Sequence, residues 1–298
     1  MGAPKNHCTS SLFSAWYSQE MQRVFSKCHT DRVWLREFLA EFIGTFILVF
    51  IGNNSVAQAV LSNQSHGQFI TINFGYGFAV MMAVLVAGGA SGGHLNPAVT
   101  LSLALVGKFP FAKIIHYMLA QYLGAFLAAA CTYVVYIDAL FNFDGGIRQI
   151  IGPQGTAGIF ATYPQEFVSL EVGFADQVIG TAILLMVVCG ITDPKNCGVS
   201  RGLIPLFVGL TVVTIGMSMG FNCGYALNPA RDLSPRFFTA ISGWTFDVFY
   251  IEQWCWVPIL GPHLGGLLGA LIYTLFIEAH WPDDGLPEVI EDGKKSYL

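Results

Sequence analysis

The tripeptide Asn-Pro-Ala occurs twice in this chain, as Asn96, Pro97 and Ala98 and again as Asn228, Pro229 and Ala230. Asparagine is a favoured helix N-cap, and proline suits the first helical position because its missing N–H would have no partner there. Each tripeptide taken alone is explained by an ordinary helix start. A helix N-terminus also carries a partial positive charge, and an asparagine amide presents N–H donors. Two such ends brought together would hydrogen-bond a neutral oxygen atom and repel cations, including hydronium.

The composition places these tripeptides in a membrane protein. Charged residues make up 11% of the chain, hydrophobic residues make up 54%, and the mean hydropathy is +0.57. Soluble domains carry roughly 25% charged residues, and so few charges cannot cover a soluble surface without large apolar patches. The net charge of −5 argues against nucleic-acid binding. The seven cysteines lack paired spacing, so we expect no disulfide framework, no metal site and no cofactor.

Long stretches without charged residues predict six membrane-spanning helices, since a span needs about 20 mostly apolar residues. They are residues 35–58, 69–87, 112–136, 176–192, 202–220 and 256–279. Two further apolar segments, 97–106 and 229–241, each begin at one of the tripeptides. At about 1.5 Å per residue, the shorter one reaches only about half of a roughly 30 Å hydrocarbon core. Both are expected to be re-entrant half-helices, which need protein or a water-filled cavity around them.

The two halves of the chain repeat each other. The segments at Glu41, Leu95 and Leu123 recur in the same order at Gln177, Leu227 and Leu264. Each half then holds three spans and one half-helix, at about residues 35–136 and 176–280. Because three is an odd number, the second half enters the membrane upside down, and inverted repeats of this kind place the solute pathway at the midplane. The fold class expected is therefore all-α integral membrane, with six spanning helices and two half-helices.

The basic residues predict the orientation of the chain. In this topology most Lys and Arg residues lie on the side of the two termini, which the positive-inside rule assigns to the cytoplasm. We expect a cytoplasmic N-terminal segment 1–34, a channel domain 35–280 with a long extracellular loop at about 137–175, and an acidic cytoplasmic tail 281–298. The C-terminal Ser296–Leu298 fits capture by a PDZ-type module, a pattern that three residues often match by chance.

On these residues the chain resembles the major intrinsic protein (aquaporin) family over about residues 35–280. The resemblance is carried by Ala40–Phe42, Ser91–Thr100 and Gly224–Asp232. It implies a pore in every subunit of a homotetramer in the plasma membrane. The glycerol-conducting branch is the more similar one, on the evidence of Asp232, Arg236 and Pro258.

By position relative to these motifs, the resemblance places an outer selectivity filter at Tyr76, Gly216, Tyr225 and Arg231. Arg231 would present a permanently charged fork of donors to solute hydroxyls. Gly216 would leave space in the passage, and the two tyrosine rings would face the carbon backbone of a solute. Two positions depart from the pattern: relatives often carry Phe or Trp at the position of Tyr76, and some carry a second buried Glu at the position of Gln177.

Three further residues have two interpretations each. Glu41 is an intramembrane acid, which is a functional candidate by default, but we favour a structural role accepting backbone N–H bonds near a half-helix. His94, two residues before Asn96, is interpreted as a hydrogen-bonded structural residue, with pH gating as the alternative. Asn63 begins a glycosylation sequon in the first outside loop, although that loop is short.

Three other functions compete with a channel. Gly216–Gly220 matches the G-x-S-x-G pattern of hydrolases, but it lies in an apolar span where GxxxG helix packing explains it. A secondary transporter also uses inverted repeats, yet the spans offer almost no ionisable groups for ion coupling. A membrane adhesion or scaffolding protein is the third alternative. The sequence favours a passive channel for water, glycerol and other small uncharged solutes, with urea left open, and with ions and protons excluded.

Overall fold

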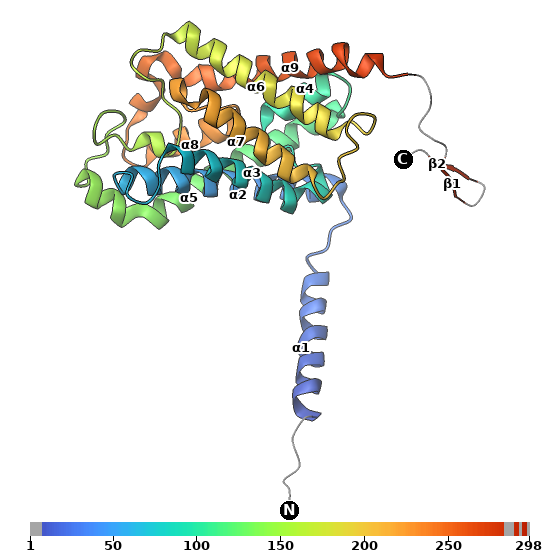
Figure 1. The fold of residues 1–298 in the computed structure, drawn as a ribbon. Helices are drawn as coiled ribbons and strands as arrows, with labels where there is room; N and C mark the ends of the chain where they lie inside the picture. The colour runs from blue at the N-terminus through green and yellow to red at the C-terminus, as the bar shows by residue number, and fades with distance from the viewer. Residues whose placement is uncertain (1–7, 283–288, 292–293, 297–298) are drawn as a thin grey trace, which may run out of the picture. The chain divides into compact units, whose positions relative to one another are not determined.

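The computed structural model describes residues 8–282, 289–291 and 294–296 of the chain, shown in Figure 1. It divides into two compact units, residues 1–36 and 37–298. The first contains α1 (Cys8–Ser26), a helix within the N-terminal segment 1–34 that the sequence did not predict. Of the expected tail features, Tyr297 and Leu298 of the terminal motif lie outside the described residues, as do the acidic residues Asp283, Asp284, Glu288 and Asp292.

In the described part of the larger unit there are six long helices and two short ones, which confirms the expected fold class. The long helices are α2 (Val33–Leu61), α3 (Phe69–Ser91), α5 (Ile114–Asp144), α6 (Leu170–Thr192), α7 (Ile204–Cys223) and α9 (Val257–Phe276). All but α2 are long and apolar enough to cross a membrane by length and composition alone, while α2 gathers its charged residues toward its start. The half-helices are α4 (Pro97–Leu105) and α8 (Pro229–Ile241).

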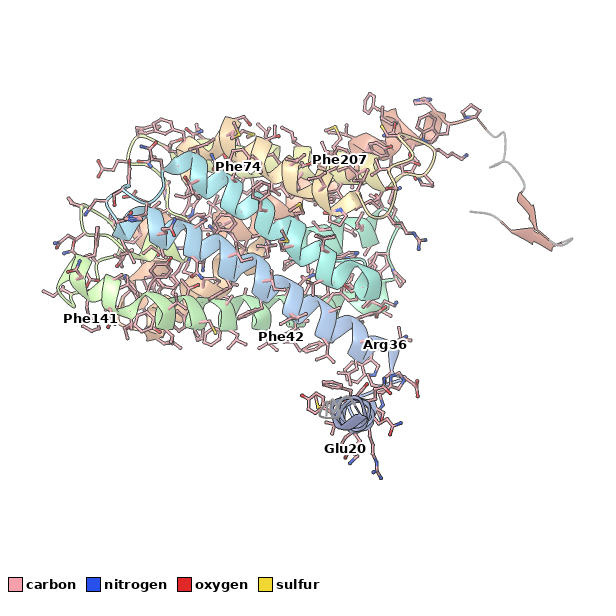
Figure 2. The ribbon with its side chains drawn as sticks, turned by 60° about the horizontal axis from the view of Figure 1, so that its bottom comes forward. Glu20, Arg36, Phe42, Phe74, Phe141 and Phe207 are labelled. Atoms are coloured by element: carbon pink, nitrogen blue, oxygen red, sulfur yellow. The ribbon has the colours of Figure 1, made fainter. Side chains whose placement is uncertain are left out.

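The remaining elements are short. They are the 3-10 turns η1 (Phe111–Lys113), η2 (Ala157–Ile159), η3 (Phe246–Phe249), η4 (Ile251–Trp256) and η5 (Glu278–His280), and the antiparallel strands β1 (Val289–Glu291) and β2 (Lys294–Ser296). Phe74 and Phe207 lie on the outside of the helical bundle in Figure 2 and are exposed. An apolar exterior of this kind suits lipid or another subunit.

The connection between the two halves is shorter than the sequence predicted. The expected loop began at residue 137, but α5 continues to Asp144 and ends at Gly145, whose φ of 64° is left-handed and whose N–H bonds to the Phe141 carbonyl. Glycine adopts this conformation without steric cost, which explains why the helix stops there. At the other end, Ser169 caps α6 by accepting a bond from the Val172 N–H. The loop proper is therefore residues 145–169.

Both half-helices begin as the tripeptides indicate. The Asn96 side-chain oxygen accepts a bond from the Ala98 N–H, and the Asn228 oxygen accepts bonds from the N–H groups of Ala230 and Arg231. Both asparagines have extended backbones, and a proline follows each as the first helical residue. These bonds satisfy amide groups that a helix start would otherwise leave without partners.

Equivalent glycines in the two repeats let their helices pack backbone to backbone. A Cβ atom added at Gly124 in α5 would collide with the Phe42 carbonyl of α2. A Cβ atom added at Gly265 in α9 would collide with the Val178 carbonyl of α6 in the same way. Small residues allow this approach between membrane helices, where dispersion contacts drive association.

We expect Gly265→Leu to separate α6 from α9 and to lower the thermal unfolding midpoint in detergent. The reason is that a side chain there has no room, and overpacking costs roughly 1–3 kcal/mol. Gly89→Leu is the matched control, because Gly89 is an exposed helical glycine and no atom of the described residues lies within 4 Å of an added Cβ. Equal midpoints for the two variants would contradict this account of the packing.

Candidate functional site

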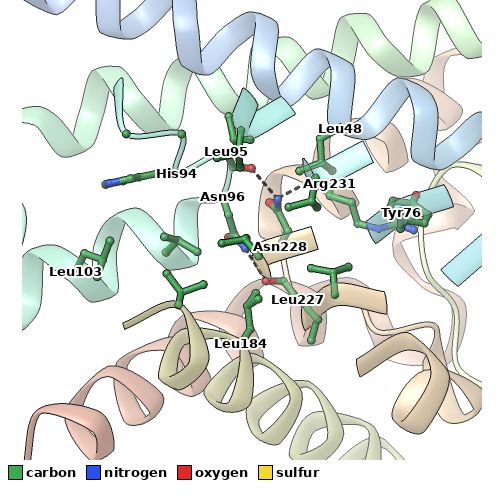
Figure 3. Close-up of a pocket in the computed structure, with 18 of the residues that line it drawn as sticks. Leu48, Tyr76, His94, Leu95, Asn96, Leu103, Leu184, Leu227, Asn228 and Arg231 are labelled. Atoms are coloured by element: carbon green, nitrogen blue, oxygen red, sulfur yellow. Dashed lines mark hydrogen bonds between the residues drawn. The ribbon is translucent and has the colours of Figure 1, made fainter. Parts of the chain in front are cut away.

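A cavity of about 270 Å³ lies between the two halves of the chain. Side chains of α2, α3, α4, α6 and α7 make its wall mostly apolar. Among them are Leu48, Val80, Val84, Val99, Leu103, Leu184, Val188, Val208 and Val212. Figure 3 shows Asn96 and Asn228 near its middle, with Arg231 toward one end and His94 toward the other. A second cavity of about 270 Å³ is lined by residues of the 145–169 loop and of α3 and α7.

Within the described part of the chain, three residues line both cavities, and they therefore lie where the two cavities meet. They are Tyr76, Tyr225 and Arg231, three of the four predicted filter residues. The Arg231 guanidinium lies over the Tyr76 ring, 4.6 Å from its centroid. The two tyrosine rings meet edge to face with centroids 6.3 Å apart. Arg231 also donates to the Phe160 carbonyl at 3.1 Å, so loop and helix together position its donors.

The fourth predicted filter residue, Gly216, lines neither cavity. A Cβ atom added there would lie 2.7 Å from Cζ of Tyr225 and 2.8 Å from Oδ1 of Asn73. The space that Gly216 leaves is thus taken by the Tyr225 ring and not by the passage itself. Gly220, one turn further along α7, makes room for the same ring and for Phe69.

The two asparagines form a reciprocal clasp between the half-helices. Asn96 donates from Nδ2 to the Leu227 carbonyl at 2.9 Å, and Asn228 donates from Nδ2 to the Leu95 carbonyl at 2.8 Å (Figure 3). Each side-chain oxygen meanwhile caps its own helix. Since an amide nitrogen has two N–H groups, each asparagine keeps one further donor. Both side chains line the cavity, where that donor can meet a solute.

The clasp depends on strained backbone. Leu95 and Leu227 have φ values of 54° and 53°, in the left-handed region that non-glycine residues rarely adopt. Such strain costs on the order of 1–3 kcal/mol per residue and persists only where the surroundings enforce it. Their equivalent places in the two repeats indicate that the strain serves the clasp, because it accompanies the carbonyls that the asparagines bind.

Glu41 holds the first strained loop. Its carboxylate accepts four hydrogen bonds, from the N–H groups of His94 and Leu95 at 2.9 and 2.7 Å, from Ser91 Oγ at 2.6 Å and from Gln121 Nε2 at 2.8 Å. The side chain is fully buried and lines neither cavity. A buried carboxylate needs this degree of bonding to offset its desolvation.

Gln177 takes the equivalent place in the second repeat. Its Oε1 accepts one bond from the Leu227 N–H at 3.1 Å, and its Nε2 donates to Cys223 Sγ at 3.1 Å. The adjacent acid, Asp176, accepts from Asn222 at 2.8 Å. The second loop is therefore held by a neutral amide with an acid beside it, whereas the first is held by a carboxylate.

His94 lines the cavity at the end away from Arg231. Its Nδ1 is 3.1 Å from Thr100 Oγ1 in α4, and its ring packs edge to face against Phe109 at 4.6 Å between centroids. The ring also lies 5.1 Å from that of Tyr117. The imidazole is thus held on one face of the cavity mouth by aromatic neighbours and one hydroxyl.

Asp232 and Arg236 fasten the long loop over α8. Asp232 accepts bonds from the Thr162 N–H at 2.7 Å and from its hydroxyl at 2.5 Å. Arg236 donates to Asp232 and to the carbonyls of Thr162 and Val248. This fully buried ion pair holds the loop segment whose Phe160 carbonyl binds Arg231. Both residues therefore support Arg231 indirectly, through this loop segment.

Among the described residues, the charged side chains that line the two cavities are basic. Arg231 lines both, and Lys108 lines the first cavity while pairing with Glu278 at 2.6 Å. In the second cavity, burial raises the pKa of the Tyr163 hydroxyl to about 12, so this loop residue stays neutral at pH 7. Among the described residues, no group of three His, Cys, Asp or Glu side chains is placed to hold a metal ion.

The other predicted residues lie apart from the cavities. Pro258 is buried in the first turn of α9, and Asn63 is exposed in the turn after α2. The Gly216–Gly220 pattern lies inside α7, so the strand-to-helix turn that a nucleophile elbow requires is not there. Sequence reasoning missed two buried asparagines, Asn53 and Asn73, which accept hydrogen bonds from the hydroxyls of Tyr76 and Tyr225. The signal available was a polar side chain inside an apolar span.

Comparison with known proteins agrees with this geometry. Residues 28–273 match the family described as major intrinsic protein. The chain is 50% identical to aquaporin-10 of Milnesium tardigradum over 83% of its length, which covers 64% of that protein. It is 51% identical to human aquaporin-9, with 83% of this chain and 84% of the relative covered. The X-ray structure of the aquaglyceroporin from Plasmodium falciparum matches with a TM-score of 0.75 at 32% identity, over 83% of this chain and 98% of that one. The family match extends over most of the chain, and the two half-helices are joined by their asparagines. The chain therefore belongs to the major intrinsic protein family.

Proposed function

We propose that this protein is a passive membrane channel, and not an enzyme, that conducts water, glycerol and other small uncharged solutes and excludes ions and protons. The observation that carries the proposal is the meeting of two cavities at Tyr76, Tyr225 and Arg231, with the asparagine clasp further along the same path. Relatives named aquaporin and aquaglyceroporin support it.

The three residues between the cavities select the solute. Arg231 supplies a permanent charge and several donors to solute hydroxyls. The carbon atoms of the Tyr76 and Tyr225 rings face the hydrocarbon part of a polyol. A small uncharged solute exchanges water for these contacts at little cost, whereas an ion cannot recover its lost hydration in a passage with apolar walls.

The asparagine clasp is the second selective point. One N–H of each asparagine remains for a solute oxygen, and the two helix N-termini add partial positive charge at the same depth. A water molecule there accepts bonds from both asparagines and cannot pass a proton along a continuous chain. Hydronium and metal cations meet two positive helix ends in a low-dielectric place.

A homotetramer in the plasma membrane is the assembly we propose, with a pore in each subunit and both termini in the cytoplasm. The apolar exterior of the bundle and the excess of basic residues on the side of the termini support it. Residues 35–280 form the channel domain, and the second cavity opens to the extracellular side. Asn63 is exposed there, as glycosylation requires. The terminal Ser296–Leu298 stays a candidate PDZ-type ligand.

Glu41 and His94 are assigned structural roles in this proposal. Glu41 has its four donors and lines no cavity, so it does not couple an ion to solute movement. Asp176, the other buried acid beside a strained loop, lines no cavity either. This arrangement opposes a secondary transporter, which uses ionisable groups at its substrate site. His94 lines the cavity mouth, and pH gating there remains the alternative to its structural role.

The test is the swelling of proteoliposomes under parallel water, glycerol and urea gradients. We expect fast water and glycerol entry that does not change when sodium or proton gradients are imposed. Flux that follows an ion gradient would indicate a transporter instead, and swelling no faster than that of protein-free liposomes would exclude the channel.

Arg231→Val should admit protons, because it removes the fixed positive charge where the two cavities meet. A pH-sensitive dye inside the proteoliposomes reports this directly, with water swelling measured on the same sample. Arg201→Val, which removes an exposed loop arginine, is the control and should leave proton flux at the wild-type level. If Arg231→Val stays proton-tight while conducting water, charge at this position does not carry the exclusion.

Gly216→Ala should depress glycerol flux more than water flux. The added Cβ falls within 3.0 Å of the Tyr225 ring, so the ring must move, and the cavities that Tyr225 lines are the free space beside it. Overpacking costs roughly 1–3 kcal/mol. If about 1.4 kcal/mol of this cost adds to the free-energy barrier for glycerol passage, glycerol flux falls about tenfold. Gly89→Ala controls for a helical glycine substitution. A parallel fall in water and glycerol would indicate general loss of folded channel.

A further inference from the structure

The hydroxyl of each tyrosine in the proposed filter donates a hydrogen bond to a buried asparagine. Tyr76 Oη donates to Asn53 Oδ1 at 2.8 Å, and Tyr225 Oη donates to Asn73 Oδ1 at 2.8 Å. Asn53 belongs to α2 and Asn73 to α3, so both partners come from the first repeat while Tyr225 comes from the second. The same arrangement thus occurs twice at one constriction.

The asparagines lie behind the rings and not in the passage. Their exposed fractions are 0% for Asn53 and 2% for Asn73, and neither lines a cavity. A phenol is rigid, so the atom that holds its oxygen also sets the direction of its ring. With the hydroxyls bonded to these amides, the ring carbon atoms are what remain for the solute.

Local stability does not account for Asn53. Burying an amide in an apolar span costs free energy unless its polar atoms are bonded. Among the described residues its Nδ2 has no partner, and the side chain's one hydrogen bond is the one from Tyr76. Next to it, Gly52 leaves room for the ring, since a Cβ there would collide with Tyr76. Gly52 thus leaves the space that the Tyr76 ring occupies, and Asn53 accepts the hydrogen bond from its hydroxyl.

We propose that Asn53 and Asn73 are positioning residues that determine the specificity of the filter. By binding the hydroxyls of Tyr76 and Tyr225, they make two polar side chains present apolar surface to the solute. Arg231 is then the principal hydrogen-bonding group at the constriction. The filter favours solutes with one hydrocarbon side and one hydroxyl side over flat solutes, such as urea, that are polar all round. This inference rests on the proposed filter.

The test is a double-mutant cycle on Asn53 and Tyr76. Asn53→Leu removes the acceptor with a side chain of similar size, and the freed hydroxyl must find a partner in the passage or on Arg231. We expect the urea-to-glycerol permeability ratio of proteoliposomes to rise about fivefold, the rate equivalent of one net hydrogen bond. Tyr76→Phe alone should keep the ratio near that of the wild type, because the ring still presents carbon atoms.

The decisive measurement is Asn53→Leu in the Tyr76→Phe background. Tyr76→Phe has no hydroxyl for Asn53→Leu to free, so Asn53→Leu should leave the urea-to-glycerol permeability ratio unchanged in this background. Its effect therefore depends on the background. If Asn53→Leu shifted the ratio equally in both backgrounds, or in neither, the positioning role would be wrong. Thr132→Val, which alters a buried polar side chain of α5 away from the filter, is the control for general packing effects.

Two further arms keep the result interpretable. Should Asn53→Leu fail to insert, the cycle on Asn73→Leu and Tyr225→Phe asks the same question at the other ring, and the same background dependence is expected there. Arg231→Val tests the filter itself. If Arg231→Val leaves the solute ratios at wild-type values, the proposed filter fails, and the role of the asparagines fails with it. If it changes them while neither cycle shows background dependence, only the inference about the asparagines is overturned.

Discussion

The reciprocal bond between each asparagine and the loop before the other asparagine is the contact on which the rest of the channel depends. Asn96 binds the Leu227 carbonyl and Asn228 binds the Leu95 carbonyl, so the N-termini of the two half-helices meet inside the bundle. Half-helices that stop inside the bundle leave amide groups that lipid cannot satisfy. The asparagine side-chain oxygens accept bonds from amides at each helix start, and the clasp holds the two positive helix ends together beside the cavity. Loss of either asparagine would therefore affect both structure and permeation.

Everything around the clasp serves to hold strained backbone in place. Leu95 and Leu227, whose carbonyls the asparagines bind, adopt left-handed conformations. Glu41 accepts a hydrogen bond from the N–H of Leu95, and Gln177 accepts one from the N–H of Leu227. The two repeats use different chemistry for the same task, a carboxylate with four donors in one and an amide in the other. A carboxylate makes the stronger bonds, so the first loop is the more firmly held of the two.

At the constriction, as at the clasp, some residues line the path and others hold them in place from behind. The residues that line the path are Tyr76, Tyr225 and Arg231. Arg231 is held from behind by the loop carbonyl of Phe160, and the buried ion pair of Asp232 and Arg236 holds that loop. Gly216 and Gly52 contribute space for rings and not for solute. In the filter that we propose, selectivity depends on which atoms of each side chain face the passage, and the buried neighbours hold those side chains in place.

Much of this architecture could be predicted from the sequence alone. Gaps between charged residues locate the spans and Asn-Pro starts locate the half-helices, because hydropathy and helix capping are properties of short segments. The end of α5 was misplaced, since the apolar pattern weakens before Gly145 stops the helix, and α1 was missed. What the sequence could not decide is the orientation of the filter side chains. The bond from Tyr76 to Asn53 joins residues 23 positions apart, and that from Tyr225 to Asn73 joins residues 152 apart. The assignment of Gly216 to a ring and not to the passage likewise depends on α3, α7 and the second loop packing together. Local sequence sets where helices begin and end, whereas the direction of a buried hydroxyl depends on which helices surround it.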